Sequence, residues 1–300
     1  MLGPTAVGKT EISLQLAQRV AGEIVSADSR LFYRGMDIGT AKPTPEERAR
    51  VPHHLIDVVA PDETWSLAEF QQAAYAAIDD IQARGRLPLL VGGTGQYLRA
   101  VTEGWQVPRQ QADPRLRAAL EAWGREIGAE RLHARLSRLD PGAAAGIEPR
   151  NLRRTVRALE VIFRTGQRFS AQRRKSRPRY RILQLGLTRP RPELYARIDA
   201  RIEHMLAAGW VDEVRGLLAR GYSPDLPAMS AIGYRELVRY LHGEISLEEA
   251  VRLIKRNTRQ FVRRQANWFK ADDPQIRWFE VTDDCVEQLE QAVKDFLKVT

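Results

Sequence analysis

A segment near the start of the chain, Gly3 to Thr10, has the residue types and spacing needed to hold a phosphate group. It reads Gly-Pro-Thr-Ala-Val-Gly-Lys-Thr, the phosphate-binding loop pattern G-x-x-x-x-G-K-T, and helix-forming sequence follows it. Gly3 and Gly8 carry no Cβ, so the backbone can curl and direct its N–H groups towards an anion at the helix N-terminus. Lys9 adds a positive charge, and the Thr10 hydroxyl can bind Mg²⁺ beside a phosphate oxygen. The pattern therefore predicts a di- or triphosphate ligand, which need not be ATP.

Two further loops carry groups that could act on such a ligand. Asp28 follows a strand predicted at 23–26, and ligands bind outside the carboxyl ends of strands in open α/β sheets. Its carboxylate can bind Mg²⁺ through water or act as a general base, although a turn or cap aspartate is an equally simple interpretation. The glycine-rich segment 92–95 follows a strand predicted at 87–91, where nucleotide hydrolases usually have an aspartate that holds Mg²⁺. No acid stands there, which weakens a kinase or ATPase interpretation.

The charge of the chain is concentrated in its middle. The chain has 300 residues, and its formal net charge is +9. Residues 108–181 contain 19 Lys/Arg and 7 Asp/Glu, a net charge of +12, so the remainder is slightly acidic. A phosphate-binding loop and a separate basic segment predict two anionic ligands, one small and one a nucleic acid. An arginine-rich composition without functional meaning is the alternative, but it would spread basic residues evenly along the chain.

Composition also excludes several classes of protein. A hydrophobic content of 43% is typical of a globular protein with a buried core. Cys285 is the single cysteine, so neither an internal disulfide nor a cysteine zinc site is expected. No apolar run approaches the ~20 residues of a membrane-spanning helix, and no signal peptide opens the sequence. We therefore expect a cytoplasmic monomer without contact to a membrane.

The order of the expected elements indicates an α/β protein with a P-loop NTPase-like parallel sheet flanked by helices and with an all-helical insertion domain. Strands are expected at 23–26, 54–58, 87–91 and 179–187, with an edge strand at 276–281. Only Met1 and Leu2 precede the first loop, whereas strands usually have about five or six residues. We therefore expect the first strand to be nearly absent, and we interpret the chain as late-started or trimmed. The expected parts are the first part of the core (1–107), a basic helical insertion (108–178) and the return to the core with C-terminal helices (179–300).

Two expected helices concentrate the basic residues. The first begins near Arg150 and sets arginines around an apolar face, with Glu160 as the opposing acid, so phosphate contact is favoured over a solvated face. The second covers residues 252–270 and contains no acidic residue. Three of its basic residues, Lys255, Arg259 and Arg263, recur four positions apart and form one stripe. The aromatic residues within it could stack on bases, but a place in the core is favoured.

Several runs elsewhere in the chain are specific enough to suggest a family. They are Gly3 to Thr10, Ser26-Ala-Asp-Ser-Arg-Leu31, Gly35-Met-Asp-Ile-Gly-Thr-Ala-Lys-Pro43, His53-His54-Leu-Ile-Asp57, Gly92-Gly-Thr-Gly95, Arg157-Ala-Leu-Glu-Val161, Ile232-Gly-Tyr-Arg235 and Thr258-Arg-Gln-x-x-x-Arg-Gln265. In content and order they resemble the motifs of the bacterial tRNA dimethylallyltransferases, also called isopentenyl-tRNA transferases. The resemblance covers nearly the whole chain, and the run that begins at Gly35 is its most specific part.

The resemblance implies transfer of a dimethylallyl group from dimethylallyl diphosphate to N6 of the tRNA adenosine directly 3′ of the anticodon. It implies a diphosphate site made by Gly3, Pro4, Thr5, Ala6, Val7, Gly8, Lys9, Thr10 and Arg197, with Mg²⁺ on Thr10. It implies catalytic roles for Asp28 as general base, for Thr94 beside the reacting atoms and for Arg201 on the diphosphate. It implies tRNA contacts from Asp28, Ser29, Arg30, Leu31, Thr94, Arg117, Arg153, Arg154, Thr155, Val156, Arg157, Arg263, Arg264, Gln265, Trp268 and Lys270. The helical insertion is then expected to hold the anticodon stem-loop.

Three other functions remain open at this point. A P-loop kinase of a nucleoside or small metabolite would turn over ATP and would be indifferent to RNA. An RNA-binding protein without catalysis would bind RNA and give no product. A prenyltransferase of free adenine nucleotides is disfavoured, because a free nucleotide needs no basic surface of the size implied by residues 108–181.

Overall fold

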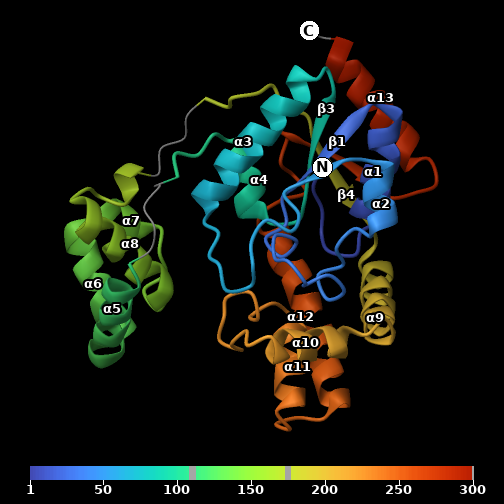
Figure 1. The fold of residues 1–300 in the computed structure, drawn as a ribbon. Helices are drawn as coiled ribbons and strands as arrows, with labels where there is room; N and C mark the ends of the chain where they lie inside the picture. The colour runs from blue at the N-terminus through green and yellow to red at the C-terminus, as the bar shows by residue number, and fades with distance from the viewer. Residues whose placement is uncertain (108–112, 173–176, 299–300) are drawn as a thin grey trace. The chain divides into compact units, whose positions relative to one another are not determined.

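The structure, a computed structural model, describes residues 1–107, 113–172 and 177–298 (Figure 1). These residues group into two compact units. Unit 1 comprises Met1–Trp65, Phe70–Arg99 and Tyr180–Thr300, and unit 2 comprises Ser66–Glu69 and Ala100–Arg179. Unit 2 holds most of the expected insertion, but the start of that insertion at residue 108 lies outside the described residues, and its boundaries stay a prediction.

Strands and helices alternate in the first third of the chain, and the described residues between α4 and β4 form helices without a strand, as the sequence predicts. The strands are β1 (Gly22–Ser26), β2 (His53–His54), β3 (Leu87–Val91), β4 (Gln184–Thr188) and β5 (Ile276–Glu280). The helices before and after the insertion are α1 (Lys9–Arg19), α2 (Pro45–Arg50), α3 (Leu67–Ala83), α4 (Gly95–Thr102), α9 (Arg191–Ala207), α10 (Trp210–Ala219), α11 (Tyr234–Leu241), α12 (Leu247–Ala266) and α13 (Cys285–Lys298). The described helices of the insertion are α5 (Pro114–Ile127), α6 (Ala129–Leu139), α7 (Pro141–Ala145), α8 (Leu152–Thr165) and a 3₁₀ turn at Ser170–Gln172.

The described strands are parallel and form two ladders, β2-β1-β3 and β4-β5. Leu2 joins them, because it bridges to Gly92 beyond β3 and to Gly186 within β4. Its N–H donates to Leu185 O at 2.9 Å, and its carbonyl accepts from Leu187 N–H at 2.9 Å. The expected first strand is thus reduced to one bridging residue, which places the phosphate-binding loop at the centre of a continuous parallel arrangement.

Two expected strands differ from those observed. The strand expected at 54–58 ends at His54, because Leu55 and Asp57 adopt left-handed backbone angles that break the pleat (φ 63° and 57°). The strand expected at 179–187 begins only at Gln184. Before it, the hydroxyl of Tyr180 donates to Asp79 on α3 at 2.7 Å, so this part of the chain follows the helix instead of the sheet. The edge strand expected at 276–281 is confirmed as β5, which pairs with β4.

Helices cover both sides of the strands. Figure 1 shows α3 and α4 on one side and α1 with α13 on the other. The apolar face of α1 packs into the main core of unit 1, where Ile12 and Leu16 join residues of α9, α10, α11 and α13. The α/β fold with a parallel sheet between helices is therefore confirmed. Among the described residues, no helix is both long and apolar enough to cross a membrane.

The helices of unit 2 form a core of their own. Leu120 of α5, Leu132 and Leu136 of α6 and Leu159 of α8 are almost fully buried against one another. Helix α8 is amphipathic, and a glycine in left-handed conformation, Gly166, ends it. The basic residues of α8 therefore stand on the side that does not face this core.

Candidate active site

Two glycines, Gly3 and Gly8, shape the phosphate-binding loop. Gly8 precedes α1 with φ 110°, a conformation that side chains disfavour. A Cβ on Gly3 would stand 2.8 Å from the carbonyl oxygen of Leu187, so β4 approaches the loop too closely for a side chain. Within the described part of the chain, the backbone N–H groups of Ala6, Gly8, Lys9 and Thr10 have no hydrogen-bond acceptor, and neither has that of Gly3 at the start of the loop. Together with the positive end of α1, they form a site that suits an anion.

Lys9 folds back over this loop. Its ammonium group donates to the carbonyl oxygens of Gly3 at 3.0 Å and Pro4 at 2.8 Å. Burial lowers the pKa of Lys9 from 10.5 to about 8, an effect that Asp28 opposes and Arg201 reinforces. These interactions place the Lys9 ammonium, the Asp28 carboxylate and the Arg201 guanidinium in one electrostatic cluster.

Three arginines from the segment after β4 surround the same loop. Arg189 donates to Val7 O at 2.9 Å, and Arg197 donates to Ala6 O at 3.0 Å. Arg201 lies one turn further along α9, and burial lowers the pKa of its guanidinium, with attraction from Asp28 and repulsion from Arg197 as smaller effects. The guanidinium groups could therefore neutralise a diphosphate held by the loop.

Sequence reasoning missed Arg189. Its signal was its position, since it comes directly after Thr188 at the carboxyl end of β4, where an α/β sheet binds ligands. Besides holding the Val7 carbonyl, Arg189 pairs with Glu193 in the first turn of α9. It therefore ties the start of α9 to the loop, and so helps to place Arg197 and Arg201.

The two other expected catalytic residues lie side by side at the ends of neighbouring strands. Asp28 follows β1, and one of its carboxylate oxygens accepts the N–H of Arg30 at 3.0 Å, which fixes a tight turn. Thr94 follows β3, and its hydroxyl accepts the N–H of Ser29 at 3.3 Å. Because the charge of Asp28 also raises the pKa of Lys9 and that of Arg201, this carboxylate lies within electrostatic range of the anion site.

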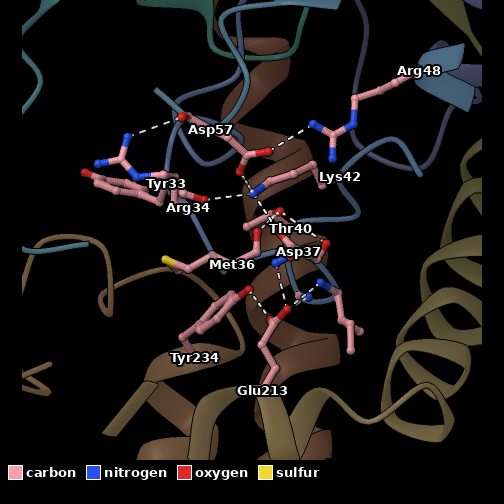
Figure 2. A network of polar contacts seen from close by, with 12 residues as sticks. Tyr33, Arg34, Met36, Asp37, Thr40, Lys42, Arg48, Asp57, Glu213 and Tyr234 are labelled. Atoms are coloured by element: carbon pink, nitrogen blue, oxygen red, sulfur yellow. Dashed lines mark hydrogen bonds and ion pairs between the residues drawn. The ribbon is translucent and has the colours of Figure 1, made fainter. Parts of the chain in front are cut away.

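A polar network fixes the segment that follows Asp28 (Figure 2). The side chain of Lys42 is 2% exposed and pairs with both Asp37 and Asp57. It also donates to Tyr33 O at 2.8 Å, while Arg48 approaches the second oxygen of Asp57 at 3.0 Å. The backbone N–H of Asp57 in turn donates to Leu31 O at 3.1 Å. The run that is most specific to the resembled family thus holds the loop from Asp28 to Leu31 in place.

The same run is held from below by Glu213 of α10 (Figure 2). The carboxylate of Glu213 accepts the N–H groups of Asp37 and Ile38 at 2.7 Å and of Gly39 at 3.2 Å. The hydroxyl of Tyr234 donates to Glu213 at 2.6 Å, and burial, with Glu213 nearby, raises the pKa of Tyr234 far above its usual value. A Cβ on Gly39 would overlap the Trp210 ring, so this turn accepts glycine only.

The expected tRNA contacts of unit 1 occupy varied positions. Arg263, Arg264 and Lys270 are exposed, Trp268 is half-buried, and Gln265 is buried at 5% exposure. Arg30 donates to Pro227 O at 3.0 Å. Basic side chains of α12 line a hollow of about 350 Å³, and they are Arg252, Lys255, Arg256, Arg259 and Arg263. The basic stripe expected on this helix is therefore present, and its contact with RNA stays a prediction.

The expected contacts of unit 2 surround one buried acid. Glu160 is fully buried and pairs with Arg117 at 2.7 Å and Arg157 at 3.0 Å. Burial by itself would raise the pKa of Glu160, but the hydrogen bonds from these two arginines hold it below its usual value. Arg153 and Arg154 are exposed. Thr155 and Val156, in contrast, have buried side chains that belong to the core of unit 2 and not to its basic surface.

The chain is similar to proteins of one family over almost its whole length. The family model described as IPP transferase matches residues 31–272. A tRNA dimethylallyltransferase of Roseiflexus sp. (strain RS-1) is 60% identical over 270 residues, which are 90% of this chain and 88% of the relative.

Solved structures agree with this similarity. The full-length tRNA isopentenylpyrophosphate transferase from Bacillus halodurans has 44% sequence identity and a TM-score of 0.74, and the match covers 99% of this chain and 95% of that chain. A eukaryotic dimethylallyltransferase acting on tRNA has 27% identity and a TM-score of 0.82, with 99% and 78% covered. The family model begins at residue 31, whereas these matches also include the phosphate-binding loop and Asp28 region.

Proposed function

The chain belongs to the IPP transferase family, and from this premise we propose that it transfers a dimethylallyl group from dimethylallyl diphosphate to tRNA. The acceptor is N6 of the adenosine directly 3′ of the anticodon, and the product is N6-isopentenyladenosine. The observation that carries the proposal is the open phosphate-binding loop with Lys9, Arg197 and Arg201 around it and with Asp28 within electrostatic range of Lys9 and Arg201. This arrangement joins a site for a leaving diphosphate to a group that can accept a proton.

The anion site supports departure of the diphosphate. When N6 attacks C1 of the donor, the C1–O bond breaks and the electron pair leaves with the diphosphate. The free N–H groups of the loop and the nearby cationic side chains are already oriented, so they stabilise the charge that develops on the leaving oxygens. Binding of the prenyl diphosphate and the base in one site also replaces a bimolecular encounter by a fixed geometry.

Asp28 supports the other half of the reaction. An exocyclic adenine amine is a weak nucleophile and loses a proton as its bond to C1 forms. The Asp28 carboxylate can take this proton, a role that typically contributes about 10²–10⁴-fold to a rate. Thr94 accepts the N–H of Ser29, so it keeps the turn that carries Asp28 next to the end of β3. The target base must leave its stack to reach this carboxylate, at a cost of a few kcal/mol.

The residues present suit Mg²⁺ as the cofactor. The Thr10 hydroxyl lies in the first turn of α1, and the described residues contain no cluster of three or more acidic, histidine or cysteine side chains that could hold a metal. Mg²⁺ is commonly held by few protein oxygens together with phosphates and waters. The Thr10 hydroxyl and the oxygens of a bound diphosphate would be suitable ligands. When bound, the ion would neutralise part of the diphosphate charge.

The basic surfaces supply the sites for tRNA in this proposal. On α12 they are the residues that line the hollow from Arg252 to Arg263, and in unit 2 they are Arg153 and Arg154 with the arginines held by Glu160. Contacts of this kind bind the phosphate backbone and position the RNA without reading its sequence.

One incubation tests the proposal against its main rival. The protein is given dimethylallyl diphosphate labelled in its prenyl group, Mg²⁺ and unmodified tRNA, and a parallel sample receives ATP and small nucleoside acceptors. We expect the label at the adenosine 3′ of the anticodon and release of diphosphate. A tRNA with another base at that position is the matched control and should remain unlabelled. Unaltered tRNA together with ATP consumption on a small acceptor would replace this function by that of a P-loop kinase.

A further inference from the structure

Gln265 is a buried amide that connects two loops of the active site. It lies in the last turn of α12, and 5% of its surface is exposed. Its side-chain oxygen accepts the backbone N–H of Thr5 in the phosphate-binding loop at 2.9 Å. Its side-chain nitrogen donates to the carbonyl oxygen of Gly93 at 3.0 Å. Both polar ends of one side chain are thus used, one on each loop.

The packing around Gln265 leaves it little freedom. A Cβ on Gly93 would stand 2.5 Å from the Gln265 nitrogen, and a Cβ on Gly95 would stand 2.3 Å from the Trp268 ring. Arg99 of α4 donates to Trp268 O at 2.6 Å. The end of α12 is therefore fitted directly against the backbone of the loop that carries Thr94, and glycines are required where it touches.

We propose that Gln265 is a positioning residue of the diphosphate site and not a contact to RNA. The inference rests on the proposed function and adds a residue role to it. By accepting the Thr5 N–H, Gln265 fixes the peptide that precedes the open N–H groups of Ala6, Gly8, Lys9 and Thr10. Its side-chain nitrogen donates to Gly93 O at the same time. The side chain therefore sets the distance between the loop that holds the leaving group and the loop that carries Thr94.

An RNA contact would require this arrangement to break. The amide keeps one further N–H and one further lone pair, but at 5% exposure a base or phosphate could reach them only if the side chain moved. That movement would break its hydrogen bonds to the half-buried Thr5 N–H and to the buried Gly93 carbonyl. The exposed basic residues of the same helical end, Arg263 and Arg264, offer phosphates a contact without that cost. The burial and the hydrogen bonds of Gln265 therefore argue against a contact between this side chain and RNA.

The test compares Gln265→Met, which keeps the length of the side chain and removes both hydrogen bonds, with Gln260→Met. Gln260 lies on the same helix and is exposed. Dimethylallyl diphosphate affinity is measured calorimetrically with Mg²⁺ and without tRNA, tRNA affinity is measured separately, and single-turnover rates follow. Because misplacement of reacting groups by about 1 Å can cost 10²-fold, we expect Gln265→Met to lose roughly 10- to 100-fold in rate and to weaken diphosphate binding. Its tRNA affinity and all properties of Gln260→Met should equal those of the wild type.

Outcomes separate this inference from the function on which it rests. Wild-type protein that neither binds the prenyl diphosphate nor modifies tRNA refutes the proposed function itself. If the wild type is active but Gln265→Met loses tRNA affinity and keeps its affinity for dimethylallyl diphosphate, the inference alone is overturned. Should the variant fail to fold, hydrogen exchange of the wild-type Thr5 amide decides: it should stay protected when tRNA binds, and loss of protection would show that RNA competes for Gln265.

Discussion

The depressed pKa of Lys9 predicts that diphosphate binding takes up a proton. Without ligand, burial holds the pKa of Lys9 at about 8 instead of 10.5, so about half of the lysines are neutral at pH 8. A bound diphosphate places negative charge beside the ammonium and raises its pKa again. Binding should then take up about half a proton at pH 8 and nearly one at pH 9.

The direction of the pH dependence follows from the same linkage. From about pH 7 upwards the bound state holds more protons than the free state, so the association constant must fall as pH rises, by up to about tenfold per unit. Below roughly pH 7 both states are protonated and the affinity should be flat with respect to Lys9. The terminal phosphate of the donor has its last pKa near 6, so the ligand itself does not titrate in this window.

Calorimetry at pH 7, 8 and 9 in buffers of different ionisation enthalpy measures the proton uptake directly. The experiment uses dimethylallyl diphosphate with constant Mg²⁺ and without tRNA, so that no transfer occurs. Lys9→Arg is the matched variant, because a guanidinium stays charged throughout this range. Whatever its affinity for the diphosphate, this variant should bind it without proton uptake. If the wild type shows no uptake at pH 8 or 9, Lys9 is either already charged or remote from the diphosphate, and the electrostatic account of the site fails.

Three further predictions concern separate parts of the protein. Asp28→Asn should lower single-turnover transfer by about 10²–10⁴-fold and leave tRNA affinity intact; a near-normal rate would remove Asp28 as the base. Lys42→Met should lower the free energy of unfolding by roughly 1–3 kcal/mol, because it leaves Asp37 without its ion-pair partner and Asp57 with Arg48 alone, although both carboxylates still reach water. Arg48→Met, which removes the more exposed partner of Asp57, should cost less, and equal losses in denaturant titrations would contradict the network. Arg154→Ala should reduce the salt dependence of tRNA binding by roughly one unit of slope, whereas Arg125→Ala, an exposed arginine paired with Glu121, should not; an unchanged slope for Arg154→Ala means that this side chain touches no phosphate.

The sequence by itself determined the parts that depend on local patterns. The phosphate-binding loop requires glycines at fixed spacing before a helix, and alternating apolar segments and helices specify a parallel sheet. The carboxyl ends of parallel strands meet at one edge. Asp28 and Thr94 could therefore be expected near the loop, and the structure brings them together. The basic stripe of α12 could also be predicted, because it follows from helical spacing alone.

Tertiary structure alone decided which distant side chains pair. Gln265 and Thr5 are 260 positions apart, and nothing in either local sequence indicates that one accepts a hydrogen bond from the other. The same holds for Arg189 on the Val7 carbonyl and for Glu213 beneath the turn at Gly39. Within α8 the resemblance implied tRNA contacts from Thr155 and Val156, but the packing of the insertion helices buries both side chains. Spacing along the chain fixes the backbone of each element, whereas the partner of a buried polar group is set by how the elements pack, because such a group must find its partner wherever the fold supplies one.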